Sequence, residues 1–492
     1  MLDATIATAH PSREYDVDVA VLGAGTAGMA AYREAMKRTE RVALIDGGPL
    51  GTTCARVGCM PSKLLIAAAE AAHETRGTDR FGIRVEGVSV DGRAVMERVR
   101  AERDRFVGFV TDAVEGFEDA HLIRSNGRFL DDHTLELDDG RRLTARSVVI
   151  ATGSRPSIPP PLEAAGDLLI VNDDVFDWTD LPRSAAVFGA GVIGLELGQA
   201  LHRLGVRVHL FGRGGSVGPL TDPDLIAYAR ETFAGEFPAS FDAEAEVSRD
   251  GDEVVVRWSE NGEMGEERFD YLLAATGRRP NLDRIGLENT SLLTDGHGSV
   301  RHDPLSMRAE IESEGLSSIF VTGDLTNPPL LHEAADEGRI AGENAARYPH
   351  VYRRARRTGL GVVFCDPQIA IAGRSHRELT EARIDFAHGE VSFEDQGRAR
   401  VIGKDKGLLR VYGARDTGEI LGAEMIGPGA EHMGHLLAWT IESRLTVTEV
   451  LQRPFYHPVL EEGLRTALRG LAATLAFGPN PPLRCIDCGP GG

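Results

Sequence analysis

The chain has no long apolar run, few cysteines and a shortage of positive charge. A membrane-spanning helix needs about 18 or more consecutive apolar residues, and no stretch approaches that length. The formal net charge of −21 over 492 residues disfavours nucleic acid and anionic membranes, because both bind surfaces rich in Lys and Arg. We therefore expect no nucleic-acid partner and no membrane partner.

The five cysteines are too few for a disulfide scaffold in a chain of this length. Residues 1–14 lack the basic-then-apolar pattern of an export signal, and we expect them to form a flexible arm. A cytoplasmic location is the corresponding expectation. In that reducing compartment a disulfide is more often catalytic than structural.

Two cysteines lie close together in residues 51–63, which read GTTCARVGCMPSK. In an unbroken helix, residues five apart are separated by about 7.5 Å along the axis, whereas a disulfide needs Cα atoms within roughly 4.4–6.8 Å. A bond between Cys54 and Cys59 therefore requires irregular backbone, which Gly58 or the approach from Gly51 to Thr53 can supply. The alternative is a pair of packed thiols that never meet.

A dinucleotide fingerprint precedes this stretch. Residues 16–22 are predicted to form a strand, followed by the glycines of a G-x-G-x-x-G loop, a helix to about residue 38, and a strand at 41–45 that ends at Asp46. The loop glycines are Gly23, Gly25 and Gly28. They let the backbone approach a pyrophosphate at a helix N-terminus, and the acid about 20 residues on suits a ribose diol.

A second fingerprint follows a predicted strand at residues 184–188. Its glycines are Gly189, Gly191 and Gly194, and the next strand is expected at 206–211. Two dinucleotides are the minimum for passing a hydride from one to another. A degenerate second unit is the alternative, which three intact glycines disfavour.

Residues 51–63 resemble the redox-disulfide segment G-G-T-C-x-N-x-G-C-x-P-S-K of the FAD-dependent class I pyridine nucleotide–disulfide oxidoreductases, with Thr52 and Arg56 as departures. The resemblance covers about residues 16–475 and is greatest to dihydrolipoyl dehydrogenases. It implies an α/β homodimer with FAD in the first fingerprint, NAD(H) or NADP(H) in the second, and a small dithiol or lipoyl domain as substrate. Cys54 would react with the substrate, and Cys59 would lie nearer the flavin.

Residues 455–462, FYHPVLEE, resemble the family's H-P-T-x-x-E segment, although Val459 replaces its Thr. The resemblance makes His457 the acid/base and Glu462 the residue that orients it. A His with an ordinary pKa near 6.5 suits this task, and simple turn or capping chemistry is the alternative. The same resemblance assigns further roles to an ion pair beside the flavin, Lys63 and Glu196 (otherwise a surface pair of little worth), and to cofactor-binding residues Thr152, Gly153, Gly277 and Asp324.

The choice of nicotinamide is ambiguous in the sequence. Gly194 is typical of NAD-dependent relatives, yet Gly212 and Arg213 follow the strand at 206–211 with no acid for the ribose 2′-hydroxyl. Arg213 aligns with an arginine that NADP-dependent relatives direct at the 2′-phosphate. One arginine without an acid predicts use of both nucleotides.

The resemblance predicts two Rossmann-like domains and an α+β dimerisation domain. The expected boundaries are an arm at 1–14, an FAD-binding domain at 15–155 and 282–355, an NAD(P)-binding domain at 156–281, a dimerisation domain at 356–475 and a tail at 476–492.

The tail carries Cys485 and Cys488, which are either a redox relay or incidental thiols; no metal site is predicted. The alternatives to dithiol oxidation are an NADPH-dependent disulfide or metal-ion reductase that uses this pair, and a catalytically silent flavin-binding partner protein. Cys365, in an apolar strand end, is predicted to be a packed, inert thiol.

Overall fold

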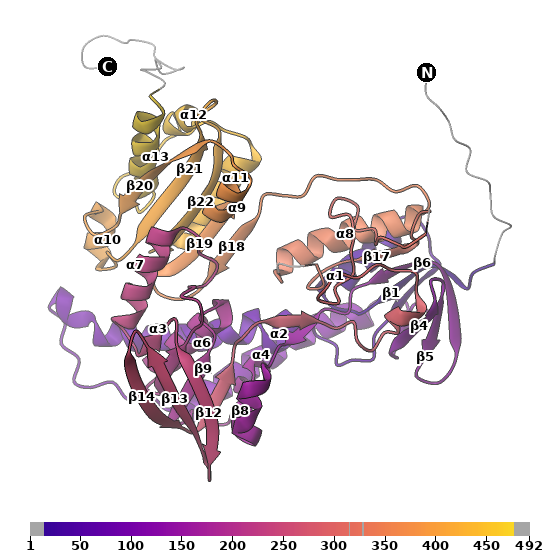
Figure 1. Ribbon diagram of the computed structural model, residues 1–492, viewed down its shortest axis with the longest axis horizontal. Coiled ribbons are helices and arrows are strands. Elements are labelled where there is room, and N and C mark those ends of the chain that lie inside the picture. The colour runs from indigo at the N-terminus through magenta and orange to yellow at the C-terminus, as the bar shows by residue number, and fades with distance from the viewer. Residues whose placement is uncertain (1–13, 314, 327–328, 477–492) are drawn as a thin grey trace. The chain divides into compact units, whose positions relative to one another are not determined.

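The computed structural model describes residues 14–313, 315–326 and 329–476 (Figure 1). The chain divides into two compact units. The first comprises Met1–Arg56, Asp104–Arg155 and Arg278–Arg356, and the second comprises Val57–Arg103, Pro156–Gly277 and Arg357–Gly492. Among the described residues, no helix combines the length and apolarity needed to cross a bilayer.

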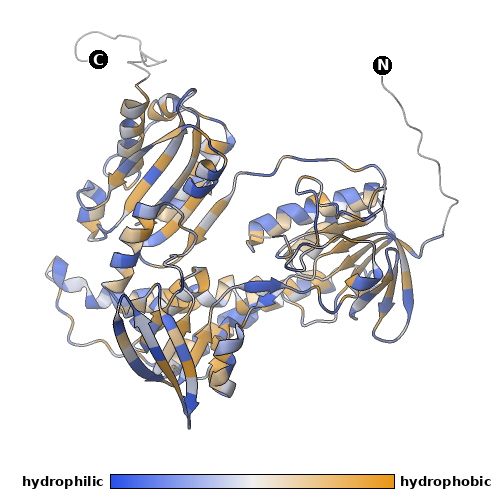
Figure 2. Ribbon diagram, in the orientation of Figure 1, coloured by the Kyte–Doolittle hydropathy of each residue, from blue (hydrophilic) through white to orange (hydrophobic). Residues whose placement is uncertain are grey.

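The first unit is built on a mixed sheet of order β3-β2-β1-β6-β5-β4, with β17 paired to β6. Strands β1, β2, β6 and β17 run parallel, and their side chains form apolar cores on both faces. Figure 2 shows these strands as mainly hydrophobic. The bounds are β1 Val17–Leu22, α1 Thr26–Ala35, β2 Val42–Ile45, β3 Leu122–Ile123, β4 Gly127–Asp131, β5 Thr134–Leu137, β6 Arg142–Ile150, β7 Ser154–Pro156, β16 Arg278–Pro280, η3 Leu287–Asn289, β17 Ile319–Val321 and α8 Leu331–Arg347. Helices α2 Thr53–Val57 and α4 Gly92–Glu115 each include residues of both units.

Helices α1 and α8 pack with their backbones close together. An added Cβ at Gly338 would lie 2.2 Å from the carbonyl oxygen of Ala27, and one at Gly342 would lie 2.2 Å from that of Ala31. Residues four apart share one helix face, so these two glycines let α8 lie directly on the helix that starts at the first fingerprint.

The second unit contains three sheets: β11-β10-β9-β15-β8, which is parallel; β12-β13-β14, an antiparallel meander; and β18-β19-β22-β21-β20, which is antiparallel. The bounds of its first part are α3 Cys59–Arg76, η1 Thr78–Phe81, η2 Pro160–Leu168, β8 Leu169–Ile170, α5 Asn172–Val175, β9 Ser184–Phe188, α6 Val192–Arg203, β10 Arg207–Phe211, α7 Pro223–Ala234, β11 Ala239–Ser240, β12 Glu244–Asp250, β13 Glu253–Glu260, β14 Glu263–Phe269 and β15 Tyr271–Ala274. Those of its last part are β18 Leu360–Val363, β19 Gln368–Gly373, α9 His376–Glu381, β20 Phe386–Ser392, α10 Gly397–Ile402, β21 Leu408–Ala414, β22 Ile420–Gly427, α11 Ala430–Glu442, α12 Val447–Leu451 and α13 Glu462–Leu475. The predicted fold class, two Rossmann-like sheets and a C-terminal α+β part, is confirmed.

Helix does not extend throughout residues 64–115, although the Ala-rich start and the charged segment at 97–106 favour it. Helix α3 ends at Arg76, and α4 begins only at Gly92. Between them, Gly82 and Gly87 have φ of +76° and +79°, which is left-handed backbone that a helix cannot contain. The meander β12-β13-β14 and strand β20 were not predicted from the sequence.

A buried carboxylate joins α7 to the sheet that contains β22. Glu424 is fully buried, and its oxygens accept hydrogen bonds from the backbone N–H groups of Thr221 (2.7 Å), Asp222 (3.1 Å) and His376 (2.8 Å). The Thr221 hydroxyl donates a fourth bond at 2.5 Å. All four of these donors are therefore paired with the carboxylate of Glu424, a group that only accepts hydrogen bonds.

We expect Glu424→Gln to lower the free energy of unfolding by about 2–3 kcal/mol, because the amide NH₂ would face backbone donors and leave them unpaired. Urea unfolding measures this change. Glu442→Gln is the matched control, since Glu442 also accepts two bonds from Thr358 but lies near the surface. Equal losses in the two variants would contradict the importance of burial at Glu424.

Candidate active site

The first G-x-G-x-x-G loop packs against backbone at its first and third glycines and faces open space at its second glycine. A Cβ added at Gly23 would lie 2.4 Å from the carbonyl oxygen of Ala151, and one added at Gly28 would lie 1.8 Å from the carbonyl oxygen of Gly23. Gly25, the N-cap of α1, has nothing within 4 Å of its Cβ position. The open side of the loop therefore exposes the unpaired N–H groups of a helix N-terminus, which fits a pyrophosphate.

The second loop repeats this geometry. A Cβ added at Gly189 would lie 2.3 Å from the carbonyl oxygen of Ala275, and one added at Gly194 would lie 1.8 Å from the carbonyl oxygen of Gly189. Gly191 caps α6 and is open in front. Both loops thus fit a dinucleotide, and the second shows no sign of degeneration.

The carboxylate of Asp46 is fixed at the end of β2. Its oxygens accept hydrogen bonds from the backbone N–H groups of Ala24 (2.5 Å) and Gly48 (2.6 Å). These bonds tie the acid to the first glycine loop, where a ribose diol would lie next to the pyrophosphate.

Three other predicted cofactor residues lie at turns of the first unit. The Thr152 hydroxyl donates to the Asn281 carbonyl oxygen at 2.8 Å, and Gly153, with φ of +68°, accepts from Asn281 N–H at 2.9 Å. Asp324 accepts a 3.0 Å bond from the Ser154 hydroxyl. In the second unit, Gly277 has φ of +108° and accepts a 2.9 Å bond from the N–H of Ser157. All these turns are rigidly bonded.

The two clustered cysteines lie in two helices separated by a break. Cys54 belongs to α2, Cys59 is the first residue of α3, and Gly58 between them has φ of −127° and ψ of −116°, which is not helical. The predicted interruption of the helix is confirmed. Cys54 is partly exposed and Cys59 is exposed.

The departure from the family motif at Thr52 is the place where the backbone is strained. Thr52 has φ of +58°, in the left-handed region where a β-branched residue is rare and glycine is preferred. Its hydroxyl accepts a 3.2 Å hydrogen bond from Ala55 N–H and so caps α2. The cap offsets part of the conformational cost of a threonine at this position.

Lys63 and Glu196 form an ion pair whose carboxylate is buried and whose ammonium is partly exposed. The Lys63 ammonium lies 2.8 Å from both carboxylate oxygens, and the Glu196 side chain is only 4% exposed. The alternative of a surface ion pair is therefore wrong. The N–H of Phe364 also donates to Glu196, at 3.0 Å, and its ring centroid lies 4.7 Å from the ammonium. Sequence reasoning did not select Phe364, which is distant in the chain from both partners.

His457 and Glu462 are hydrogen-bonded. Nδ1 of His457 lies 2.9 Å from Oε2 of Glu462, and the His457 side chain is 80% exposed. Glu462 also accepts from Val459 N–H (3.4 Å) and from Arg465 (2.7 Å). Desolvation acts to raise the pKa of Glu462, but the bonds from His457 and Val459 and the charge of Arg465 outweigh it and lower that pKa. The carboxylate is therefore ionised near neutral pH and holds Nδ1, which leaves Nε2 at the surface.

Arg213 is exposed immediately after β10. Among the described residues, no acidic side chain forms an ion pair with it. The preceding residue cannot be an acid: an added Cβ at Gly212 would lie 2.7 Å from the Phe241 carbonyl oxygen.

Cys365 is buried, and burial raises the pKa of its thiol well above the ordinary value, as expected for an unreactive packed thiol.

Comparison with known proteins identifies the family. The model of the pyridine nucleotide–disulphide oxidoreductases matches residues 17–338, and that of the dimerisation domain of the same family matches residues 360–468. The chain belongs to this family. FAD and NAD(H) as cofactors are thereby confirmed, and the dimerisation domain supports the predicted homodimer.

Several members of the family are similar over nearly their whole length. Dihydrolipoyl dehydrogenases of Thermus scotoductus and Geobacillus stearothermophilus are 30% and 28% identical; the alignments cover 92% and 91% of this chain and 97% and 94% of the relatives. The structure of LpdA from Mycobacterium tuberculosis matches with a TM-score of 0.77 and 25% identity over 92% of this chain and 99% of that one. The HOCl-induced flavoprotein disulfide reductase RclA from Escherichia coli, at 20% identity and a TM-score of 0.75 over 92% and 99% of the two chains, shares the fold.

Proposed function

We propose that this oxidoreductase is a dihydrolipoyl dehydrogenase-like enzyme, which oxidises a small dithiol or a dihydrolipoyl group and reduces NAD⁺. The observation that carries the proposal is the His457–Glu462 hydrogen bond, because it holds Nδ1 and leaves Nε2 of an exposed imidazole able to accept a thiol proton. The similarity to dihydrolipoyl dehydrogenases over most of the chain supports the same substrate class.

In the proposed reaction, Cys54 and Cys59 form a disulfide in the oxidised enzyme. A substrate thiolate attacks Cys54 Sγ, and the Cys54–Cys59 bond breaks with Cys59 leaving as a thiolate. The second substrate thiol then attacks the mixed disulfide, which releases the oxidised substrate and leaves Cys54 reduced. His457 of the partner subunit accepts the proton of the attacking thiol, and the proton of the second thiol passes to the departing Cys54 thiolate. Bound FAD supplies the two-electron chemistry that links the reduced cysteines to the nicotinamide.

The remaining residues are proposed to bind the cofactors. For FAD these are the first glycine loop, Asp46, Thr152, Gly153 and Asp324; for the nicotinamide nucleotide they are the second loop, Arg213 and Gly277. Lys63 and Glu196 are proposed to lie beside the flavin. The domain boundaries stated above and a cytoplasmic location complete the proposal, since a catalytic disulfide without structural ones suits a reducing compartment.

A substrate panel tests the proposal. Purified protein should reduce NAD⁺ with dihydrolipoamide faster than with reduced glutathione or dithiothreitol. A preference for NADPH-driven disulfide or metal-ion reduction, lost when Cys485 and Cys488 are both changed to serine, would instead support a reductase that uses the tail. Those two cysteines lie outside the described residues.

We expect both nicotinamide nucleotides to be used, with kcat/KM values within about 1–3 kcal/mol of each other, the scale of one hydrogen bond to a charged group. Arg213→Ala should lower the efficiency with NADPH by about 10–100-fold and leave that with NADH nearly unchanged. Gly212→Glu is unsuitable as a test because its Cβ would collide with Phe241. Steady-state kinetics with both nucleotides provide the measurement; equal losses with NADH and NADPH would remove Arg213 from phosphate recognition.

A further inference from the structure

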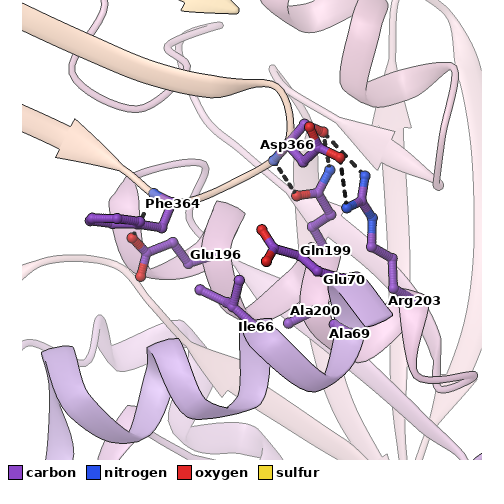
Figure 3. Close-up of a pocket in the computed structure, with 9 residues that line it drawn as sticks. All are labelled: Ile66, Ala69, Glu70, Glu196, Gln199, Ala200, Arg203, Phe364 and Asp366. Carbon is purple, nitrogen blue, oxygen red and sulfur yellow. Dashed lines mark hydrogen bonds and ion pairs between the residues drawn. The ribbon is translucent and has the colours of Figure 1, made fainter. Parts of the chain in front are cut away.

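The segment that joins β18 to β19 lies against one face of α6 (Figure 3). Its contacts on the helix are Glu196, Gln199 and Arg203, which are spaced by three and four residues and therefore share a face. All three are at most 4% exposed. In Figure 3, Phe364 lies at the end of the face that carries Glu196, and Asp366 lies over Gln199 and Arg203.

The side chain of Gln199 holds the backbone of this segment. Its amide oxygen, Oε1, accepts the N–H of Asp366 at 2.8 Å, and its Nε2 donates to the backbone carbonyl oxygen of Asp366 at 2.7 Å. Arg203 adds an ion pair to the Asp366 side chain at 3.0 Å. Both backbone groups of one residue are thus paired with one buried amide, which fixes the position of the segment along the helix.

At its other end, the segment contacts both members of the Lys63–Glu196 ion pair. The N–H of Phe364 donates to the same Glu196 oxygen, Oε1, that accepts from Lys63, and the aromatic ring lies over the ammonium. The orientation of the carboxylate and the place of the ammonium therefore both depend on Phe364. Gln199 itself has no contact with Lys63 among the bonds of the described residues.

We propose that Gln199 is a positioning residue for Lys63, acting through Asp366 and Phe364. If the segment shifts, the Phe364 N–H moves away from Glu196 and the ring moves away from Lys63. The ammonium then loses its ring contact, and its carboxylate partner loses one of the bonds that orient it. The consequence for catalysis rests on the proposed function, in which this ammonium lies beside the flavin. The placement of Lys63 itself does not depend on it.

Amine labelling measures the placement directly, because the chain has only four lysines, at positions 37, 63, 404 and 406. Acetic anhydride acylates neutral amines, so an ammonium released from its carboxylate reacts faster. In the FAD-loaded protein, we expect Gln199→Met and Phe364→Leu to raise the labelling rate of Lys63, relative to exposed Lys37, by about 3–10-fold. Peptide mass spectrometry gives both rates in one sample.

Phe237→Leu is the matched control. It removes the same atoms as the change at Phe364, which is partly buried, from a buried phenylalanine elsewhere in the unit, whose ring lies 5.6 Å from that of His202. Its Lys63:Lys37 ratio should stay within about twofold of the wild type. Gln199→Glu, which keeps the acceptor for Asp366 N–H but loses the donor, should also raise the ratio and replaces Gln199→Met if that variant does not fold.

An unchanged ratio in the Gln199 variants, or an equal rise in Phe237→Leu, would overturn the proposal. The labelling needs no dithiol substrate. A protein that fails to oxidise dihydrolipoamide yet shows the expected ratios would therefore refute the proposed function and leave the positioning role intact.

Discussion

Replacing Cys59 with serine is expected to leave FAD bound and to abolish the long-wavelength charge-transfer absorbance on two-electron reduction. The band requires a thiolate next to the oxidised flavin, and serine is not ionised at neutral pH. Dithiol-dependent reduction of NAD⁺ should fall below about one thousandth of the wild-type rate, as for the loss of other essential catalytic residues. Absorbance during anaerobic dithionite titration measures the first effect, and steady-state kinetics measure the second.

The same titration counts electrons. Wild-type protein should take up about two electrons per subunit more than the Cys59→Ser variant, because a disulfide is a two-electron couple. Replacing Cys485 and Cys488 together is the control, and the charge-transfer band should remain in that variant. Persistence of the band in Cys59→Ser would assign the thiolate to another cysteine, and an equal electron count would exclude a redox disulfide at residues 54 and 59.

His457→Gln is expected to lower dithiol turnover by about 10²–10⁴-fold, the usual contribution of a positioned acid/base. Reduction of the flavin by NADH should be largely spared, because that half-reaction needs no thiol proton transfer to His457. Stopped-flow absorbance separates the two half-reactions. The control is His432→Gln, since His432 is similarly exposed and also lies near a carboxylate, that of Glu431 at 3.6 Å.

The pH dependence provides a second measure of this pair. The pKa of Glu462 is lowered from 4.5, so its hydrogen bond to His457 is fully present above that ordinary value and is lost only as the pH falls through the lowered one. Between about pH 5 and 9, Glu462 should therefore stay ionised and hold His457 in place, and the pH profile of dithiol turnover should change in His457→Gln. A profile that is unchanged in His457→Gln would place the base elsewhere.

Much of the fold followed from local patterns. The glycine loops, the strands before them and the break at Gly58 each depend on neighbours within a few residues, and strand β9 begins and ends as expected. The failures are of one kind. Residues 77–91 do not continue the helix, because Gly82 and Gly87 there adopt left-handed backbone, and strand β20 forms through pairing with β21, which no local pattern indicates.

The sequence by itself determined the family, the two dinucleotide loops and the pairing of each candidate residue with its motif. Only the tertiary structure decided the environment of those residues. Glu196 became a buried partner of Lys63 because Phe364, 168 residues further along, donates to it and covers the ammonium. Gly212 excludes an acid because the Phe241 carbonyl lies against it. Burial and steric contact arise between segments far apart in the chain, whereas a sequence motif gives information only about residues that are close together in the sequence.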